Sequence, residues 1–114
     1  MRPDDQIRIQ HILDAANQAR QFAEGHERHD LCKNKQLLFA LVKCIEIMGE
    51  AASKVSDEAK SLHNCIPWKQ MTDMRNRLIH AYFDININFV WDTVTDEIPV
   101  LVQQLMAIVQ PPST

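Results

Sequence analysis

Apolar residues recur at three- and four-residue steps along most of the chain, which is the spacing of one face of an α-helix. The first such stripe predicts a helix from Pro3 to Glu24 that Gly25 ends. Its members are Ile9, Ile12, Leu13, Ala16, Ala19 and Ala23, with Ile7, Ala15 and Phe22 widening the stripe. Residues 25–33 are polar and aperiodic, so we expect a loop there.

A second stripe predicts a helix from Asn34 to Val55. Gly49 interrupts this helix, where glycine costs about 1 kcal/mol relative to alanine. A glycine in such a place often indicates the close approach of a neighbouring helix. Ser56 or Asp57 can cap a further short helix through Leu62. The apolar positions of the stripe are Leu37, Leu38, Leu41, Val42, Ile45, Met48, Ala52 and Val55, which fit either a core or a seam between two copies.

The second half of the chain predicts two more helices. Pro67 suits the first turn of a helix from Pro67 to Ala81, with Trp68, Met71 and Leu78 on its apolar face. Phe83–Asn88 alternates like a strand but has no partner strand, so we interpret it as a connector. The last helix is predicted from Asn88 to Gln110, with Phe89, Val90, Val94, Ile98, Leu101, Leu105 and Ile108 on its stripe. Pro99 is expected to kink or split it near Glu97.

Four amphipathic helices with short links predict an all-α, up-and-down four-helix bundle with a short extra helix. The 114 residues suffice for one domain, which we place at residues 1–114. Two glycines and five prolines are too few for a turn-rich β-fold. No apolar run exceeds six residues, the N-terminus lacks an apolar signal stretch, and the three cysteines form no C-x-x-C pair. We therefore expect a cytoplasmic protein with reduced thiols and no membrane span.

The net charge of −3 argues against a protein that coats nucleic acid nonspecifically, because such binding requires the neutralisation of many phosphates. The excess of acid lies entirely in Trp91–Thr114, which contains no Lys or Arg. Between residues 28 and 43, four cations face one acid; they are Arg28, Lys33, Lys35 and Lys43, against Asp30. That stretch fits either a solvated face or a local footprint for a polyanion.

The chemically informative segment is residues 74–83, which contains Arg75, Asn76, Arg77, His80 and Tyr82. Arginine offers a planar fork of donors for phosphate oxygens, and histidine titrates near neutrality and can act as general acid or base. RNA carries its own nucleophile, the 2′-hydroxyl, so such a set can cleave RNA without a metal ion. The same residues also fit a plain surface helix whose C-terminal cations offset the helix dipole.

Arg75 and Asn76, followed by His80 and Tyr82, resemble the R-x-x-x-x-H-x-Y signature of HEPN domains. The surrounding sequence is similar to the HepT-like branch of that family in the same order. The matching segments are residues 4–12, the Met-Gly-Glu-Ala-Ala of 48–52, the Ile-Pro-Trp-Lys-Gln-Met of 66–71, the Met-Arg-Asn of 74–76 and Val90-Trp91. Together these segments span nearly the whole chain.

The resemblance implies a metal-independent endoribonuclease that acts as the toxin of a type VII-like toxin–antitoxin pair, with no cofactor of its own. It implies a homodimer whose two motifs meet in a cleft, with Arg75 binding the scissile phosphate and His80 as general acid–base. Asn76 would orient His80 or the phosphate. The implied partner is an MntA-type nucleotidyltransferase, which would transfer AMP from ATP to Tyr82 and so silence the toxin; ATP enters only through this partner.

Two further residues remain open between a functional and a plain role. Arg77 is either an accessory phosphate-binding residue or a solvent-facing charge. Glu50 is either a partner that orients Arg75 or His80, or an exposed helix acid. For the whole protein, the alternatives are a non-catalytic HEPN subunit that binds substrate or nucleotide for the nucleotidyltransferase, and a purely structural bundle.

Two other groups of residues favour ordinary roles. His26-x-x-His29-x-x-Cys32 has the residue types of a metal site, but it supplies at most three ligands, so we interpret it as a polar loop and expect no metal. Trp68 and Trp91 could stack on bases, but both fall on apolar stripes, which favours core packing.

Overall fold

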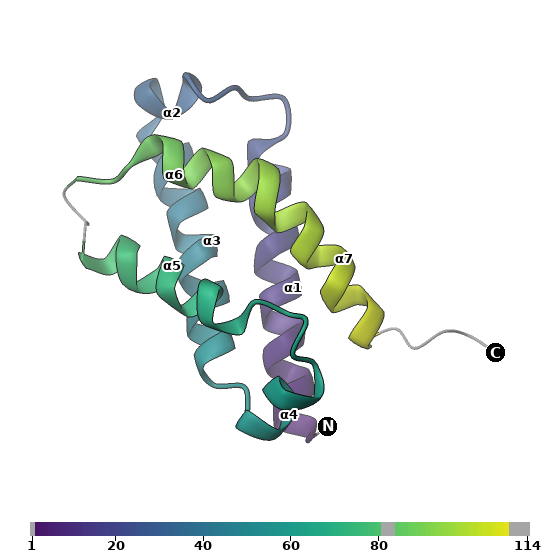
Figure 1. Ribbon diagram of the computed structural model, residues 1–114. Coiled ribbons are helices and arrows are strands. Elements are labelled where there is room, and N and C mark those ends of the chain that lie inside the picture. The colour runs from purple at the N-terminus through teal and green to yellow at the C-terminus, as the bar shows by residue number, and fades with distance from the viewer. Residues whose placement is uncertain (1, 81–83, 110–114) are drawn as a thin grey trace.

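The computed structural model describes residues 2–80 and 84–109, the side chains of 79 and 80 excepted, and all regular structure in these ranges is helical (Figure 1). The all-α prediction is therefore confirmed. The long elements are α1 (Pro3–Ala23), α3 (Lys35–Ser53), α5 (Trp68–His80) and a fourth limb made of α6 (Ile87–Asp92), η1 (Thr93–Glu97) and α7 (Ile98–Val109). The short elements are α2 (Asp30–Lys33) and α4 (Asp57–Leu62).

Helix α3 is the centre of the bundle, because it packs against α1 on one side and α5 on the other. The fourth limb crosses this layer, with α6 over α3 and α7 over α1 (Figure 1). None of the described helices combines the length and the apolar character needed to cross a membrane. The expected end of the third helix at Ala81 and the start of the connector at Phe83 lie outside the described residues, whereas residues 84–86 form no strand.

Side-chain caps fix where three helices begin. The Oδ1 atom of Asn34 accepts from the backbone N–H of Leu37 at 3.0 Å at the start of α3. Ser56 Oγ does the same for α4, and Asn86 Oδ1 for α6. Each cap satisfies a backbone donor that has no partner within its own helix. The predicted helix starts near Asn34 and Ser56 are therefore confirmed, with a physical reason for each.

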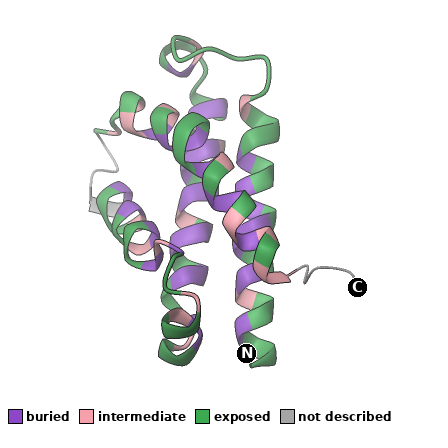
Figure 2. Ribbon diagram, turned by 45° about the vertical axis from the view of Figure 1, so that its right-hand side comes forward, coloured by how far each residue is buried: buried purple, intermediate pink, exposed green. Residues whose placement is uncertain are grey.

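Most of the core consists of residues that the apolar stripes predict, seen as buried positions facing inward in Figure 2, whereas the predicted Ala23, Phe89 and Ile108 are only partly buried. Ile9, Ile12, Leu41, Ile45, Met48 and Leu105 are fully covered. Two expectations were wrong, since Ile7 and Phe22 are 51% and 39% exposed. Ile7 lies two residues before Ile9 and thus about 200° around the helix from it. Phe22 lies in the last turn of α1, next to the polar loop that follows.

The expectation of a loop over residues 25–33 was wrong for its last four residues, which form α2. Asp30 organises this turn, since its Oδ2 accepts from the backbone N–H of Glu27 at 2.8 Å and lies 3.2 Å from Nδ1 of His26. Leu31 is 1% exposed and anchors the turn in the core. One apolar residue makes no periodic pattern, so the sequence stripe could not indicate this helix.

Contrary to expectation, Pro99 does not break the last helical segment but changes its hydrogen bonding. The chain stays helical, but residues 93–97 form a π-helix, with the N–H of Ile98 donating to the carbonyl of Thr93 five residues back. Proline has no N–H, so the usual bond to the carbonyl of Thr95 cannot form. A wider turn just before Pro99 accommodates this loss, and the helix continues as α7.

A buried carboxylate ties the start of α1 to the start of α4. Asp5 is 3% exposed, and its two oxygens accept from the backbone N–H of Ser56 at 2.8 Å and from its Oγ at 2.7 Å. These hydrogen bonds from Ser56 hold the pKa of Asp5 below its ordinary value of 3.8. Ser56 is itself the cap of α4, so Asp5 fixes both the cap and the chain that leads into it.

We expect Asp5→Ala to lower the free energy of unfolding by about 2 kcal/mol at neutral pH, because it leaves the Ser56 donors unpaired. Since the folded pKa is depressed, the contribution is complete above pH 3.8 and is lost as the pH falls through the lower folded pKa. Urea unfolding of both proteins from pH 7 to pH 3 measures this, with the exposed neighbour variant Asp4→Ala as control. Equal losses for the two variants would contradict the anchor.

Candidate active site

The site begins with the contact between α3 and α5 at Gly49. Gly49 is buried, and a Cβ added there would lie 2.7 Å from the carbonyl oxygen of Met71 and closer still to the Cβ of Arg75. No larger residue fits without a shift of α5, because real Cβ atoms do not approach so closely. The prediction that Gly49 marks a close helix approach is confirmed. The helix that this glycine admits is the one that contains Arg75 and His80.

Arg75 is held in place by two neighbours. Its Nη1 donates to Oε2 of Glu50, and its Nε and Nη2 donate to Oδ1 of Asn76 at 3.3 and 3.0 Å. The side chain is 19% exposed, so the guanidinium is mostly covered but still reaches the surface. A guanidinium has five N–H donors, and among the described residues these bonds use three. Two N–H donors are therefore not used by the described residues.

Glu50 balances the charge of Arg75. Its other oxygen, Oε1, lies 3.4 Å from Nζ of Lys54, four residues later and directly after the end of α3. Hydrogen bonds from Lys54 and then Arg75 hold the pKa of Glu50 below its ordinary value, so the carboxylate is ionised at neutral pH. The structure thus places Glu50 beside Arg75, one of the two residues for which a partner role was expected.

His80 is the last residue of α5, five residues after Arg75. Five residues correspond to about 140° around the axis, so the two positions of one chain do not share a helix face. Asn76 precedes His80 by one turn, and the structure places its amide oxygen on Arg75. Tyr82 lies outside the described residues.

Arg77 is placed elsewhere. Its guanidinium carbon lies 4.1 Å from the centre of the Phe89 ring, a cation–π contact between α5 and α6. Arg77 and Phe89 line a hollow distinct from the one beside Arg75. The structure therefore does not bring Arg77 to the Glu50–Arg75 pair. Sequence spacing could not show this, because Phe89 approaches from a separate helix.

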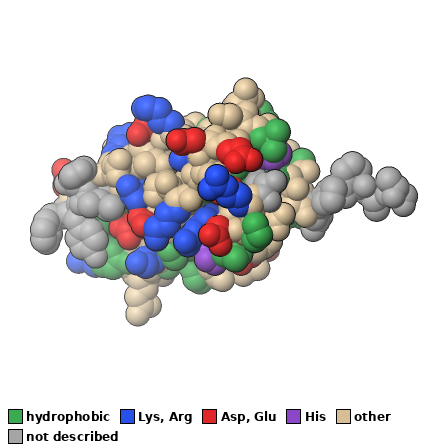
Figure 3. All heavy atoms as spheres, turned by 90° about the horizontal axis from the view of Figure 1, so that it is seen from below, with side chains coloured by type: hydrophobic (Ala, Val, Ile, Leu, Met, Phe, Trp, Pro, Cys, Tyr) green, Lys and Arg blue, Asp and Glu red, His purple; other side chains and the backbone are tan. Residues whose placement is uncertain are grey.

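A hollow of about 340 Å³ lies beside Arg75, and several of its residues were missed by sequence reasoning. Arg8 and His11 come from α1, Glu46 comes from α3, and Lys54 directly follows α3; Lys43 of α3, which the predicted basic stretch included, also lines the hollow. Lys43, Glu46 or Ile47, Glu50 and Lys54 recur at helical spacing along α3 and just after it, which was the available signal. Seen from below, the surface has Lys and Arg gathered among Asp and Glu, with no broad field of one sign (Figure 3).

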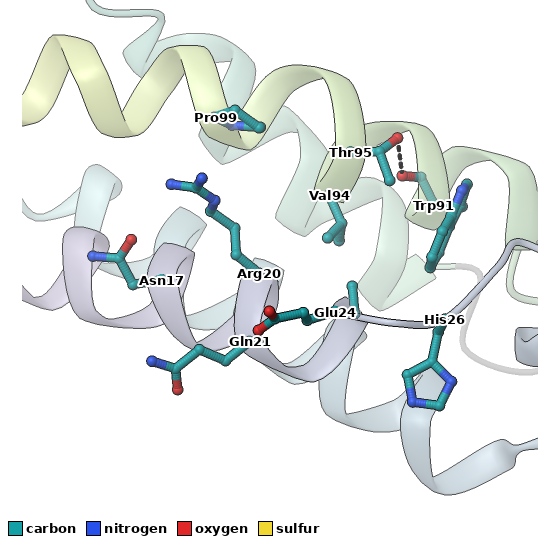
Figure 4. A pocket seen from close by; sticks show the side chains of 10 residues that line it. Asn17, Arg20, Gln21, Glu24, His26, Trp91, Val94, Thr95 and Pro99 are labelled. Atoms are coloured by element: carbon teal, nitrogen blue, oxygen red, sulfur yellow. Dashed lines mark hydrogen bonds between the residues drawn. The ribbon is translucent and has the colours of Figure 1, made fainter.

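The remaining candidates have structural surroundings. Trp68 is 7% exposed and donates from Nε1 to the carbonyl of His63 at 3.0 Å, which confirms core packing. Trp91 is only half-buried and lines a second hollow of about 670 Å³ between α1 and the fourth limb (Figure 4). In the described ranges, no three His, Cys, Asp or Glu side chains gather as a metal site would require.

An all-α bundle in which one helix has Arg75 in its second half and ends at His80 is the arrangement expected of a HEPN protein. The family model described as HepT-like, "Ribonuclease HepT-like", matches residues 12–108. This chain belongs to the HepT-like ribonuclease family, whose members are endoribonucleases, and the resemblance inferred from the motif is confirmed.

Relatives agree with this assignment. A candidate RNase of Caldanaerobacter subterraneus subsp. tengcongensis is 35% identical over 102 residues, covering 90% of this chain and 91% of that protein. A candidate ribonuclease HepT of Thermococcus cleftensis is 36% identical over 93 residues, covering 82% and 84%. A candidate RNase of Methanocaldococcus jannaschii is 31% identical over 99 residues, covering 87% and 82%. No solved structure matches the chain.

We expect Gly49→Ala to destabilise the protein by about 1–2 kcal/mol, although alanine favours helix, because the added methyl group overpacks the α3–α5 contact. The same shift should displace Arg75 and lower the rate of RNA cleavage. Urea unfolding and a cleavage assay measure the two effects, with the exposed variant Gln36→Ala on α3 as control. A stability equal to or above that of the wild type would show that α5 yields freely.

Proposed function

We propose that this protein is a metal-independent endoribonuclease toxin that cleaves RNA through attack of the 2′-hydroxyl. The observation that carries the proposal is the held but unsaturated guanidinium of Arg75, on the helix that ends with His80. An arginine whose fork is oriented in advance, with two donors left over, suits the oxygens of a phosphodiester. Membership in a ribonuclease family supports RNA as the substrate.

In the proposed reaction, the 2′-oxygen attacks the adjacent phosphorus and the bond to the 5′-oxygen breaks. The products are a 2′,3′-cyclic phosphate and a 5′-hydroxyl. His80, as general base, takes the proton from the 2′-hydroxyl, and a water molecule donates a proton to the leaving 5′-oxygen. Arg75 stabilises the negative charge that grows on the phosphate oxygens. Glu50 and Asn76 act as positioning residues, since both hold the guanidinium.

The proposal includes a homodimer. Within one chain, the positions of Arg75 and His80 diverge by about 140° around α5, so one phosphate is served more readily by residues of two chains. Two copies of the motif facing each other across a shared cleft would bring Arg75 of one copy near His80 of the other. This arrangement keeps α5 intact in both copies.

The proposed regulator is a nucleotidyltransferase antitoxin that transfers AMP from ATP to the hydroxyl of Tyr82, with pyrophosphate as leaving group. Tyr82 follows His80 by two residues, so the added phosphate would place a negative charge next to the site and repel RNA. We expect a mass increase of one or more AMP groups on coexpression with the nucleotidyltransferase, lost in Tyr82→Phe. Modification of Tyr82→Phe to the same extent would contradict this target.

The decisive test compares wild type with His80→Ala in cells that lack the antitoxin. We expect growth arrest and new RNA fragments with cyclic phosphate ends for wild type, and a loss of cleavage of at least about a hundredfold for His80→Ala. Total RNA is analysed after induction, and purified protein is assayed with and without a chelator. His29→Ala, an exposed histidine in the loop before α2, is the matched control and should cleave like wild type.

Fragments produced equally by wild type and His80→Ala would contradict the role of His80. Folded wild-type protein that yields no fragments in cells or in vitro would contradict the nuclease. That result would favour the alternative of a subunit that binds substrate or nucleotide for its nucleotidyltransferase. Cleavage abolished by a chelator would contradict the metal-independent mechanism.

A further inference from the structure

The hollow beside Arg75 is also lined by positive side chains from two other helices. Arg8 and His11 of α1, Lys43 of α3 and Lys54, which directly follows α3, line it, and Arg75 of α5 completes its wall. Residues 8 and 43 are far apart in the sequence and meet here only because α1 and α3 pack side by side. The hollow is therefore a product of the fold, continuous with the Arg75 site.

The cations of this hollow divide into two kinds. Lys54 and Arg75 are both engaged by Glu50. Arg8 and Lys43 have no ion-pair partner in the part of the chain that the structure describes, and Lys43 is exposed. The lining has four cations, Arg8, Lys43, Lys54 and Arg75, against the two carboxylates of Glu46 and Glu50, so the hollow keeps a positive excess that attracts an anion.

The lining also shows which kind of anion fits. The volume of about 340 Å³ exceeds what a single phosphate group fills, and Ile47 and Ala51 add apolar surface between the charged groups. Ile47 is 40% exposed and therefore presents apolar surface that a bound molecule can contact. Glu46 also lines the hollow and would disfavour a small, highly charged ion. Alternating charge and apolar surface suits a polynucleotide strand, with phosphates, riboses and bases.

We infer that this hollow is an RNA-binding subsite, in which Arg8 and Lys43 bind phosphates that neighbour the scissile one. The inference rests on the proposed function, because it takes the strand that Arg75 holds and follows it along the surface. It assigns to Arg8 and Lys43 a role in binding, not in the chemical step. The region that binds RNA is thereby extended from α5 across α3 to α1.

The test measures the affinity of the full-length protein for a fluorescent single-stranded RNA oligonucleotide of mixed sequence, in a His80→Ala background that keeps the RNA intact. We expect the pair Arg8→Gln and Lys43→Gln to weaken binding about tenfold. The slope of log affinity against log salt should fall by about 1.4, since each phosphate contact on a single strand contributes about 0.7. The matched control is the pair Arg20→Gln and Lys60→Gln, which removes the same charge elsewhere on the surface.

Unchanged affinity and slope in the Arg8→Gln and Lys43→Gln double variant would overturn the subsite. Equal losses in this variant and in the control double variant would also overturn it. Loss of affinity for an acidic partner protein, with RNA binding intact, would overturn it in favour of a protein interface. Cleavage assays with an intact His80 separate this inference from the proposed function. If the wild type cleaves RNA and the Arg8→Gln and Lys43→Gln double variant binds and cleaves equally well, the subsite alone is contradicted. If the wild type neither binds nor cleaves RNA, both the subsite and the proposed function are contradicted.

Discussion

The contact at Gly49 is the constraint on which the site depends. Arg75 can approach Glu50 only because α5 lies against α3 at a distance that leaves no room for a Cβ. The glycine sets the separation of the two helices, and the residue after it places a carboxylate at the guanidinium. Backbone packing and charge placement are thus determined by two consecutive residues, and neither would have the same effect without the other.

Much of the fold could be predicted from sequence because helical periodicity records burial directly. The stripes on α1, α3, α5 and α7 named the core, and the caps at Asn34 and Ser56 were visible as residue types. Prediction from the sequence failed where a single residue, or a contact between residues distant in the sequence, determines the local structure. Leu31 anchors α2 in the core without any periodic apolar pattern around it. The hydrogen bonds between Ser56 and Asp5 join residues 51 positions apart, so the sequence near Ser56 does not indicate them.

The site follows the same division. Arg75, His80 and Tyr82 could be named because they form a motif within one helix and the residues after it, and Glu50 because it follows a conspicuous glycine. Lys43 belongs to the basic stretch that fits a polyanion footprint, but Arg8 was not identified, since only the packing of α1 on α3 brings the two together. Arg77 shows the converse, because proximity in sequence to Arg75 did not bring it to the same hollow; Phe89 holds it against α6.

The π-helical segment at residues 93–97 gives the last limb one residue more than a regular α-helix of that length would contain. Everything after it, from Pro99 to Val109, is therefore rotated by about 100° relative to an uninterrupted helix. Leu101, Val102 and Leu105 are buried in α7, which packs against α1 with that rotation in place. Loss of one residue from this turn would leave the composition almost unchanged, yet it would turn the apolar side of α7 out of alignment with the bundle.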